Sequence, residues 1–157
     1  MIKAIVSDFS KVILFPKEVT FMGGLNKLHR ELFGKNKDYD FLEYFVLNTE
    51  LLDYYKLLKQ KYSINIFTTG TIQNVPQIKD TIEPIFDQII SADDFDLNKS
   101  DSNAYIFVAK KLSKSPEEIL YIDDNEQNVN AAKEAGFDTF LYKDNKSLIS
   151  YLDSNLK

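Results

Sequence analysis

The stretch Ile2-Lys3-Ala4-Ile5-Val6-Ser7-Asp8-Phe9-Ser10-Lys11-Val12 joins a short apolar run to an acidic residue. The run has the length and composition of a buried parallel strand that ends at the acid. Because open α/β sheets bind ligands beyond the carboxyl ends of their strands, Asp8 is predicted to lie in a binding crevice. Ser10 follows two residues later and places a hydroxyl, rather than a second carboxylate, beside Asp8.

Four more short apolar runs follow along the chain, with helical segments between them. This alternation predicts an α/β fold, a Rossmann-like three-layer αβα sandwich with a five-stranded parallel sheet and a short helical insertion after strand one. A helix that begins near Asn128 is expected to end at Gly136, the residue type favoured just beyond a helix. The expected strands are residues 2–7, 63–68, 87–91, 119–122 and 138–142.

Composition limits the classes of protein that this fold could serve. The chain has 157 residues, 44% of them hydrophobic, which suits a single domain over 1–157. A net charge of -5 and a pI near 4.9 argue against nucleic acid as a partner. The absence of cysteine excludes disulfides and thiolate metal sites, and no apolar stretch approaches the ~20 residues of a membrane span. Without a signal-peptide pattern at the N-terminus, we expect a cytoplasmic protein that does not bind membranes.

Residues 13–62 interrupt the alternation and are predicted to form a helical insertion within the domain, a small cap with helices near 24–33 and 40–61. His29 and Arg30 within it are interpreted as surface residues. Its many aromatic side chains could form a lid or a surface for a protein partner or for self-association, or they could pack against the main core. The aromatic residues are Tyr39, Phe41, Tyr44, Phe45, Tyr54, Tyr55 and Tyr62.

Polar residues follow several of the expected strands. Asp8 ends the first strand, Thr68-Thr69 the second and Asp123-Asp124 the fourth, while Lys99 precedes the helix that leads to the fourth strand. Parallel strand ends converge on one edge of a sheet, so these groups should surround a single crevice. Carboxylates that hold Mg²⁺, a lysine that neutralises phosphate and a hydroxyl that donates to it suit phosphoryl transfer. Asp124 could also cap the following helix.

These residues resemble the motifs of the haloacid dehalogenase (HAD) superfamily of hydrolases, and the resemblance covers nearly the whole chain outside the insertion. In the first family motif, Asp-x-Asp-x-Thr/Val, Asp8 matches the nucleophile and Val12 the last position. Thr68 matches the hydroxyl of the second motif, and Lys99 matches the lysine of the third although its usual prolines are replaced. The run Leu120-Tyr121-Ile122-Asp123-Asp124-Asn125-Glu126-Gln127-Asn128-Val129 matches the fourth closely.

The resemblance implies a Mg²⁺-dependent phosphatase that acts through an aspartyl-phosphate on a small phosphorylated substrate, a phosphoric monoester or an acyl phosphate. Asp8 would be the nucleophile, and Thr68, Thr69 and Lys99 would bind the transferring phosphoryl group. The implied Mg²⁺ ligands are Asp8, Asp124 and the backbone carbonyl of Ser10, with Asp123 and Asn128 in support.

Ser10 departs from the family pattern, because phosphatases of the family place their general acid and base, a second aspartate, at this position. A serine hydroxyl is too weak an acid to replace it at neutral pH. General acid–base catalysis contributes about 10² to 10⁴ in rate, or roughly 3–5 kcal/mol. We therefore expect a weak phosphohydrolase restricted to good leaving groups such as acyl or aryl phosphates. Lys11, where the family usually has glycine, adds a second cation near the phosphate.

Two other classes of function stay open at this stage. The first is a catalytically impaired protein of the same fold that binds phosphate or a protein partner without turnover. The second is a dehalogenase or phosphonate-cleaving relative, since those branches also lack the second aspartate. Dehalogenase relatives use an arginine for halide, and Arg30 is the only arginine here. Phosphonate-cleaving relatives need a cap lysine, for which only Lys17, Lys27 or Lys35 could be nominated.

Overall fold

The computed structural model describes residues 1–156 and has a parallel five-stranded sheet at its centre. The strand order is β5-β4-β1-β6-β7, so the first strand of the chain is the middle strand of the sheet. Each expected strand is confirmed to within two residues at either end. The strands are β1 (Ala4–Ser7), β4 (Ser63–Thr68), β5 (Gln88–Ser91), β6 (Ile119–Asp123) and β7 (Asp138–Leu141).

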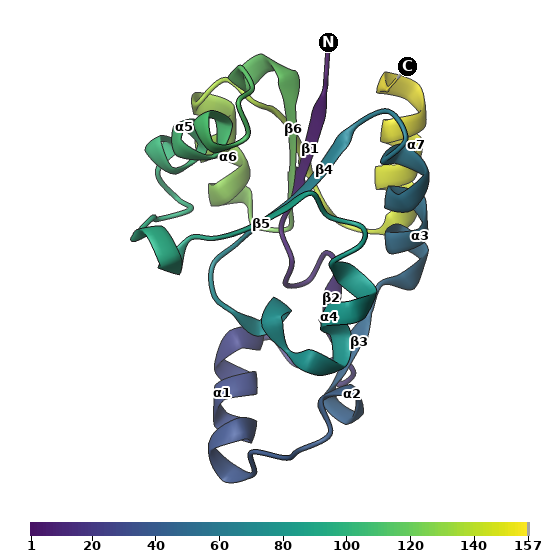
Figure 1. Cartoon of the computed structure of the whole chain (residues 1–157), viewed down its shortest axis with the longest axis vertical. Helices are drawn as coiled ribbons and strands as arrows, with labels where there is room; N and C mark the ends of the chain where they lie inside the picture. Colours follow the sequence, from purple (N-terminus) through teal and green to yellow (C-terminus); the bar gives the residue numbers. More distant parts are fainter. Residues whose placement is uncertain (157) are drawn as a thin grey trace.

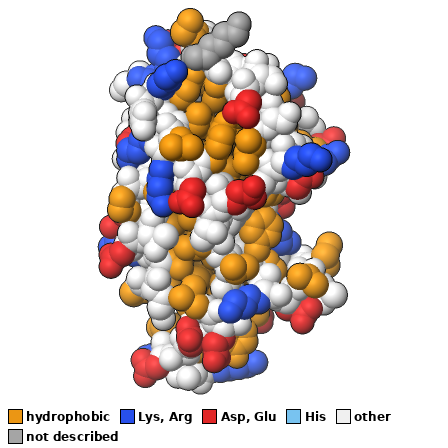
Figure 2. All heavy atoms as spheres, turned by 90° about the vertical axis from the view of Figure 1, so that its right-hand side faces the viewer, with side chains coloured by type: hydrophobic (Ala, Val, Ile, Leu, Met, Phe, Trp, Pro, Cys, Tyr) orange, Lys and Arg blue, Asp and Glu red, His pale blue; other side chains and the backbone are white. Residues whose placement is uncertain are grey.

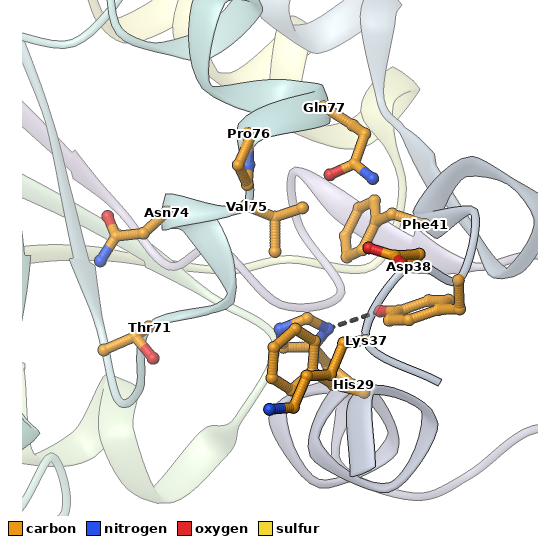
Figure 3. Close-up of a pocket in the computed structure, with 11 residues that line it drawn as sticks. His29, Lys37, Asp38, Phe41, Thr71, Asn74, Val75, Pro76 and Gln77 are labelled. Carbon is orange, nitrogen blue, oxygen red and sulfur yellow. Dashed lines mark hydrogen bonds between the residues drawn. The ribbon is translucent and has the colours of Figure 1, made fainter. Parts of the chain in front are cut away.

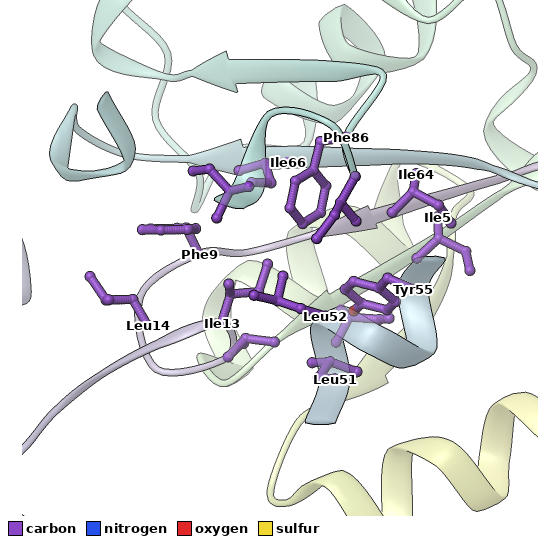
Figure 4. Close-up of a cluster of buried hydrophobic side chains, with 14 of the residues drawn as sticks. Ile5, Phe9, Ile13, Leu14, Leu51, Leu52, Tyr55, Ile64, Ile66 and Phe86 are labelled. Atoms are coloured by element: carbon purple, nitrogen blue, oxygen red, sulfur yellow. The ribbon is translucent and has the colours of Figure 1, made fainter. Parts of the chain in front are cut away.

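Strand β1 is central because both of its faces are apolar. Ile5 points into one buried hydrophobic cluster, whereas Ala4 and Val6 point into the other, and all three are fully buried. Figure 4 shows the first cluster, where Ile5 and Ile64 from the sheet meet side chains from the helical layer. With a core on each face, the register of β1 is fixed and so is the place where it ends.

Helices cover both faces of the sheet, which confirms the predicted Rossmann-like three-layer α/β architecture. In Figure 1, α5 and α6 lie to the left of the sheet, and α3 and α7 lie to the right. Figure 2 shows the right-hand side of the molecule, where hydrophobic side chains are interrupted by acidic and basic ones. The helices are α3 (Thr49–Leu58), α4 (Pro76–Ile82), α5 (Ser102–Lys111), α6 (Glu126–Glu134) and α7 (Asn145–Asn155), with short 3₁₀ turns η1 (Ile72–Asn74), η2 (Asp93–Phe95) and η3 (Pro116–Glu118).

The segment after β1 differs from the two predicted helices. Helix α1 (Leu25–Lys35) is present, but the helix expected over 40–61 is wrong: the chain forms α2 (Phe41–Tyr44), β3 (Phe45–Leu47) and then α3. Strand β3 pairs antiparallel with β2 (Leu14–Pro16), and Asn48 donates to the carbonyl of Val12 at 2.9 Å. This pairing joins residues about 30 positions apart, which local helical periodicity does not reveal.

The aromatic residues of this segment mostly enter the main core. Phe41, Phe45 and Tyr55 are fully buried, and the rings of Phe41 and Phe45 stack with centroids 4.5 Å apart. Helix α3 packs against α7 on the sheet, whereas α1 and α2 lie at the lower end in Figure 1. Tyr44 keeps 42% of its surface exposed. The division into one domain with an insertion over 13–62 stays a prediction.

Two local features define the ends of α6, the helix that begins at the site. Gly136 follows α6 with a φ of +94°, a left-handed conformation that favours glycine, as predicted. The side chain of Asn125 caps the start of α6 by accepting from the backbone N–H of Gln127 at 2.9 Å. Among residues 1–156, no helix has the length and apolar character needed to cross a membrane.

Candidate active site

A cleft of about 340 Å³ opens at the carboxyl ends of β1, β4 and β6. The strand ends converge there because the three strands are parallel neighbours in the sheet. All of the site residues predicted from the sequence line this cleft. They are Asp8, Ser10, Thr68, Thr69, Lys99, Asp123, Asp124 and Asn128.

Lys99 is a buried cation placed between two carboxylates. Its Nζ lies 2.8 Å from Oδ1 of Asp8 and 3.0 Å from Oδ2 of Asp123, and its side chain is only 5% exposed. The hydroxyl of Tyr105 donates to the backbone carbonyl of Lys99 at 2.8 Å and holds the backbone in place. Burial acts to lower the pKa of Lys99, but the two carboxylates outweigh it and raise the pKa above its ordinary value. The side chain therefore carries a fixed positive charge.

Asp8 is buried at the floor of the cleft. Its backbone N–H donates to the carbonyl of Ile122 at 2.7 Å, which ties the residue to the end of β6. Burial raises the pKa of Asp8 to about 7, the Lys99 ammonium acts to lower it, and the charge of Asp123 raises it again. Metal-free Asp8 therefore gains a proton more readily than an ordinary aspartate.

Asp123 is fully buried, and its oxygens are occupied by protein donors. Oδ1 accepts from the backbone N–H of Asn125 at 2.8 Å. Oδ2 accepts from the Tyr121 hydroxyl, from Nδ2 of Asn128 at 3.0 Å and from Lys99. With these four donors, Asp123 serves to orient Lys99 and the start of α6 rather than to bind a ligand directly.

Asp124 is the more exposed member of the acidic group. Because Asn125 caps α6, the alternative role of Asp124 as that cap is wrong, and its carboxylate faces the cleft. Partial burial, with the charge of Asp123, raises the pKa of Asp124.

The three carboxylates suit a divalent cation. One oxygen each from Asp8, Asp123 and Asp124 lies within 4.8 Å of the others. Three carboxylates against the single buried ammonium of Lys99 leave an excess of negative charge when all are ionised. Because the oxygens of Asp123 accept from protein donors, Asp8 and Asp124 would supply the hard oxygen ligands that Mg²⁺ prefers, with Asp123 in support. The donor set therefore fits the implied ion.

A tight turn after β1 presents Ser10 and Lys11 to the cleft. The backbone N–H groups of Ile13 and Leu14 both donate to the carbonyl of Phe9, at 2.9 Å each. Within the turn, Lys11 has a φ of +62°, a conformation uncommon for a residue with a Cβ. Oγ of Ser10 is buried and has no hydrogen-bond partner among the described residues. The position thus holds a small side chain that is not part of a proton-transfer network.

The sequence interpretation missed residues that α1 and its preceding loop bring to the cleft. Asn26 lines the cleft, and its Oδ1 accepts from the backbone N–H of Ile72 at 3.1 Å. A Cβ on Gly70 would lie 2.5 Å from the same oxygen, so glycine permits this close approach. Asn26 belongs to no motif that would single it out. Gly24, Leu25 and Asn125 are the other unpredicted lining residues.

A second cavity, of about 590 Å³, lies between α1 and α4 (Figure 3). His29 and Tyr39 meet there with Nδ1 and the hydroxyl oxygen 2.5 Å apart. His29, interpreted as a surface residue, is half-buried at the wall of this cavity, and burial lowers its pKa with help from Arg30. Arg30 is exposed as expected. This cavity shares no lining residue with the cleft of Asp8.

Comparison with known proteins identifies the family. A profile of haloacid dehalogenase-like hydrolases matches residues 15–142, most of the chain. The chain belongs to the haloacid dehalogenase-like hydrolases. The match begins after Asp8 and Ser10, so the roles of these two residues, which line the cleft, stay predictions. No curated protein matches the chain.

Solved structures of HAD proteins share this fold. A HAD family enzyme from Bacteroides thetaiotaomicron, in complex with magnesium and inorganic phosphate, aligns over 94% of this chain and 99% of its own at 15% identity and a TM-score of 0.69. A predicted HAD-like family hydrolase from Porphyromonas gingivalis aligns over 100% and 98% at 16% identity and a TM-score of 0.68. A 2-haloacid dehalogenase from Pseudomonas syringae pv. Tomato aligns over 90% and 86% at 12% identity and a TM-score of 0.65. At such identities the likeness establishes a shared fold.

Proposed function

We propose that this HAD protein is a Mg²⁺-dependent phosphohydrolase that acts through an aspartyl-phosphate on Asp8 and is restricted to good leaving groups, such as acyl or aryl phosphates. The observation that carries the proposal is the cluster at the cleft floor, where Lys99 lies 2.8 Å from Asp8 and two more carboxylates lie within 4.8 Å. This cluster combines a nucleophile, a fixed cation and hard oxygen donors for a metal. A solved structure of similar fold holds magnesium and inorganic phosphate, which is consistent with the proposal.

In the first chemical step, a carboxylate oxygen of Asp8 attacks phosphorus, and the bond from phosphorus to the leaving oxygen breaks. The leaving oxygen takes the bonding electrons and departs as a carboxylate or phenolate, which needs no proton. Lys99 and the Thr68 hydroxyl, which line the same cleft, stabilise negative charge on the phosphoryl oxygens. Asp8 must be ionised for this attack.

In the second step, water attacks phosphorus, the phosphorus–oxygen bond to Asp8 breaks, and the carboxylate returns while the water proton passes to solvent. Bound Mg²⁺ would neutralise phosphoryl charge, held by Asp8 and Asp124 with the Ser10 carbonyl. Asp123 and Asn128 would support it. Ser10 offers no base for the water, so we expect this step to be slow.

The remaining alternatives receive less support. Arg30, the only candidate for halide binding, is exposed on α1 and does not line the cleft. None of Lys17, Lys27 and Lys35, the candidates for a Schiff base, lines it either. Phosphate binding without turnover is the main competitor, because Ser10 lacks the acid and base that turnover of alkyl phosphates needs.

Phosphate release with and without Mg²⁺ tests the proposal, with acetyl phosphate, phenyl phosphate and glycerol phosphate as substrates. We expect release from the first two only, and a loss of about 10⁴-fold or more in Asp8→Asn. Asp94→Asn, an exposed aspartate outside the cleft, is the matched control. Phosphate release by Asp8→Asn at the wild-type rate would exclude Asp8 as the nucleophile. If no phosphate were released from any substrate, the alternative of a catalytically impaired protein that binds phosphate or a protein partner would be favoured.

Ser10→Asp tests the explanation for the restricted leaving groups. The variant restores a carboxylic acid at the family's acid–base position, so release from glycerol phosphate should rise by about 10² to 10⁴. Release from acetyl phosphate should change much less, since its leaving group needs no proton. If the wild type already cleaves glycerol phosphate readily and Ser10→Asp brings no gain, this account of Ser10 is wrong.

A further inference from the structure

An apolar pocket of about 640 Å³ adjoins the active-site cleft. Lys11 and Asp124 line both spaces, so the pocket begins where the metal and phosphoryl groups would lie. Pockets of this size accommodate small organic ligands. The apolar walls come from β2, β3, the loop before α1 and the segment after β7. The side chains are Phe15, Pro16, Val19, Phe21, Met22, Val46 and Tyr142.

The pocket exposes hydrophobic surface that a ligand could cover. Val46 keeps 45% of its surface exposed although it belongs to a strand. The rings of Phe15 and Tyr142 lie with centroids 6.4 Å apart, inclined at 46°. The Tyr142 hydroxyl donates to Oδ1 of Asn145 at 2.8 Å, which fixes the ring with its polar end already paired. The walls therefore suit a flat apolar group rather than a sugar.

The rim of the pocket is cationic. Lys11, Lys17 and Lys143 line it, and Asp124, a proposed metal ligand, is the only acid among its lining residues. The acidic neighbours in sequence, Glu18 and Asp144, do not line the pocket, although Asp144 lies close enough to Lys143 to interact with its charge. A group bound here would thus meet an apolar wall and a surplus of positive charge.

Lys11 connects the pocket to the cleft. Its backbone adopts the left-handed conformation, and its Nζ lies 3.4 Å from the carbonyl oxygen of Met22 in the loop before α1. The side chain thus stands between the loop and the phosphoryl site. A backbone conformation that costs energy is more often kept where it places a functional side chain.

We infer that this pocket binds the leaving group of the substrate and that the leaving group is an aromatic ring with an additional acidic substituent. The inference rests on the proposed function and adds a substrate class to it. Two independent observations agree on this class. Ser10 cannot protonate a leaving oxygen, which favours a phenolate, and the adjoining pocket has aromatic walls with a cationic rim. An aryl phosphate with a carboxyl group meets both conditions.

Non-hydrolysable phosphonates test this without requiring turnover. Methylphosphonate, benzylphosphonate and 4-carboxybenzylphosphonate are titrated into the protein with Mg²⁺ and followed by calorimetry. Benzylphosphonate should bind about tenfold more tightly than methylphosphonate because its ring leaves water. The carboxyl group should add about another fivefold at low salt, and this gain should shrink as salt increases. Equal affinity for methylphosphonate and benzylphosphonate would overturn the inference that the pocket binds the leaving group. If no phosphonate bound in a Mg²⁺-dependent way, the proposed function on which the inference rests would be overturned.

Two pairs of variants locate the binding. Val46→Asp places a charge on the exposed strand face in the pocket and should abolish the advantage of benzylphosphonate while methylphosphonate still binds. Leu57→Asp, at an exposed leucine on α3 outside the pocket, should retain it. Lys143→Met should remove most of the carboxyl gain, and Lys146→Met should not, because Lys146 does not line the pocket. Retention of the benzyl advantage in Val46→Asp would overturn the inference.

Discussion

The floor of the active-site cleft and the loop that lines the adjoining pocket are built in opposite ways. On the floor, Asp8, Lys99 and Asp123 are at most 7% exposed, and each is held by hydrogen bonds or ion pairs to neighbouring strands. In the loop before α1, which lines the adjoining pocket and is called the rim below, Val19 and Met22 are 89% and 85% exposed. Catalytic groups are commonly held on a rigid scaffold, whereas selectivity for substrates commonly depends on loops with fewer contacts. Under the proposed function, chemistry and substrate choice would therefore belong to different segments of this chain.

Among the variants that test the floor, Lys99→Met should have the largest effect on stability. The substitution leaves Asp8 and Asp123 close together without their shared cation, so the free energy of unfolding should fall by about 3–5 kcal/mol. Urea unfolding measures it, with Lys110→Met, an exposed lysine of α5, as control. A loss no larger than that of the control would show that the ion pairs do not stabilise the floor.

The next largest expected effect is that of Asp8 protonation on the affinity for Mg²⁺. With a pKa of about 7 in the metal-free protein, Asp8 is mostly protonated at pH 6 and mostly ionised at pH 8. Because a metal ligand must be ionised, affinity for Mg²⁺ should rise about tenfold between these values and level off above them. Calorimetry in buffers of different protonation enthalpy would detect the released proton. Mg²⁺ affinity that is flat from pH 6 to 8 would contradict the raised pKa.

Lys11→Gly tests the boundary between floor and rim. Glycine adopts the left-handed conformation found at Lys11 without strain, so the variant should be more stable by about 1 kcal/mol in urea unfolding. Its affinity for 4-carboxybenzylphosphonate should fall at the same time, because the cation that lines both spaces is lost. Destabilisation would mean that the contact of Lys11 with the Met22 carbonyl outweighs the backbone strain.

Met22→Ser is expected to have the smallest effect on stability. Because the side chain is 85% exposed, the free energy of unfolding should change by less than about 0.5 kcal/mol. The same change at a buried floor residue would be much more costly. Thermal and urea unfolding measure the difference, and a loss above 1 kcal/mol would show that the rim is packed as firmly as the floor.

The sheet and the floor of the site were predictable from the sequence because their signals are local. A buried parallel strand leaves a continuous apolar run, and the residue that ends it must lie at the sheet edge, which places Asp8, Thr68 and Asp123 together. The pairing of β2 with β3 was not predictable, since it depends on contacts between residues far apart in the chain. Asn26 was missed for the same reason, because it reaches the cleft only after α1 docks beside Ile72.

The sequence by itself determined the α/β class, the five strands and the order of chemical groups at their ends, because each of these depends on hydrophobic periodicity and on the direction of parallel strands. Only the tertiary structure decided that Asp123 is saturated by four donors, that Asn125 rather than Asp124 caps α6, and that an apolar pocket opens beside Lys11. Those features arise where side chains from distant segments meet, and packing in three dimensions brings them together.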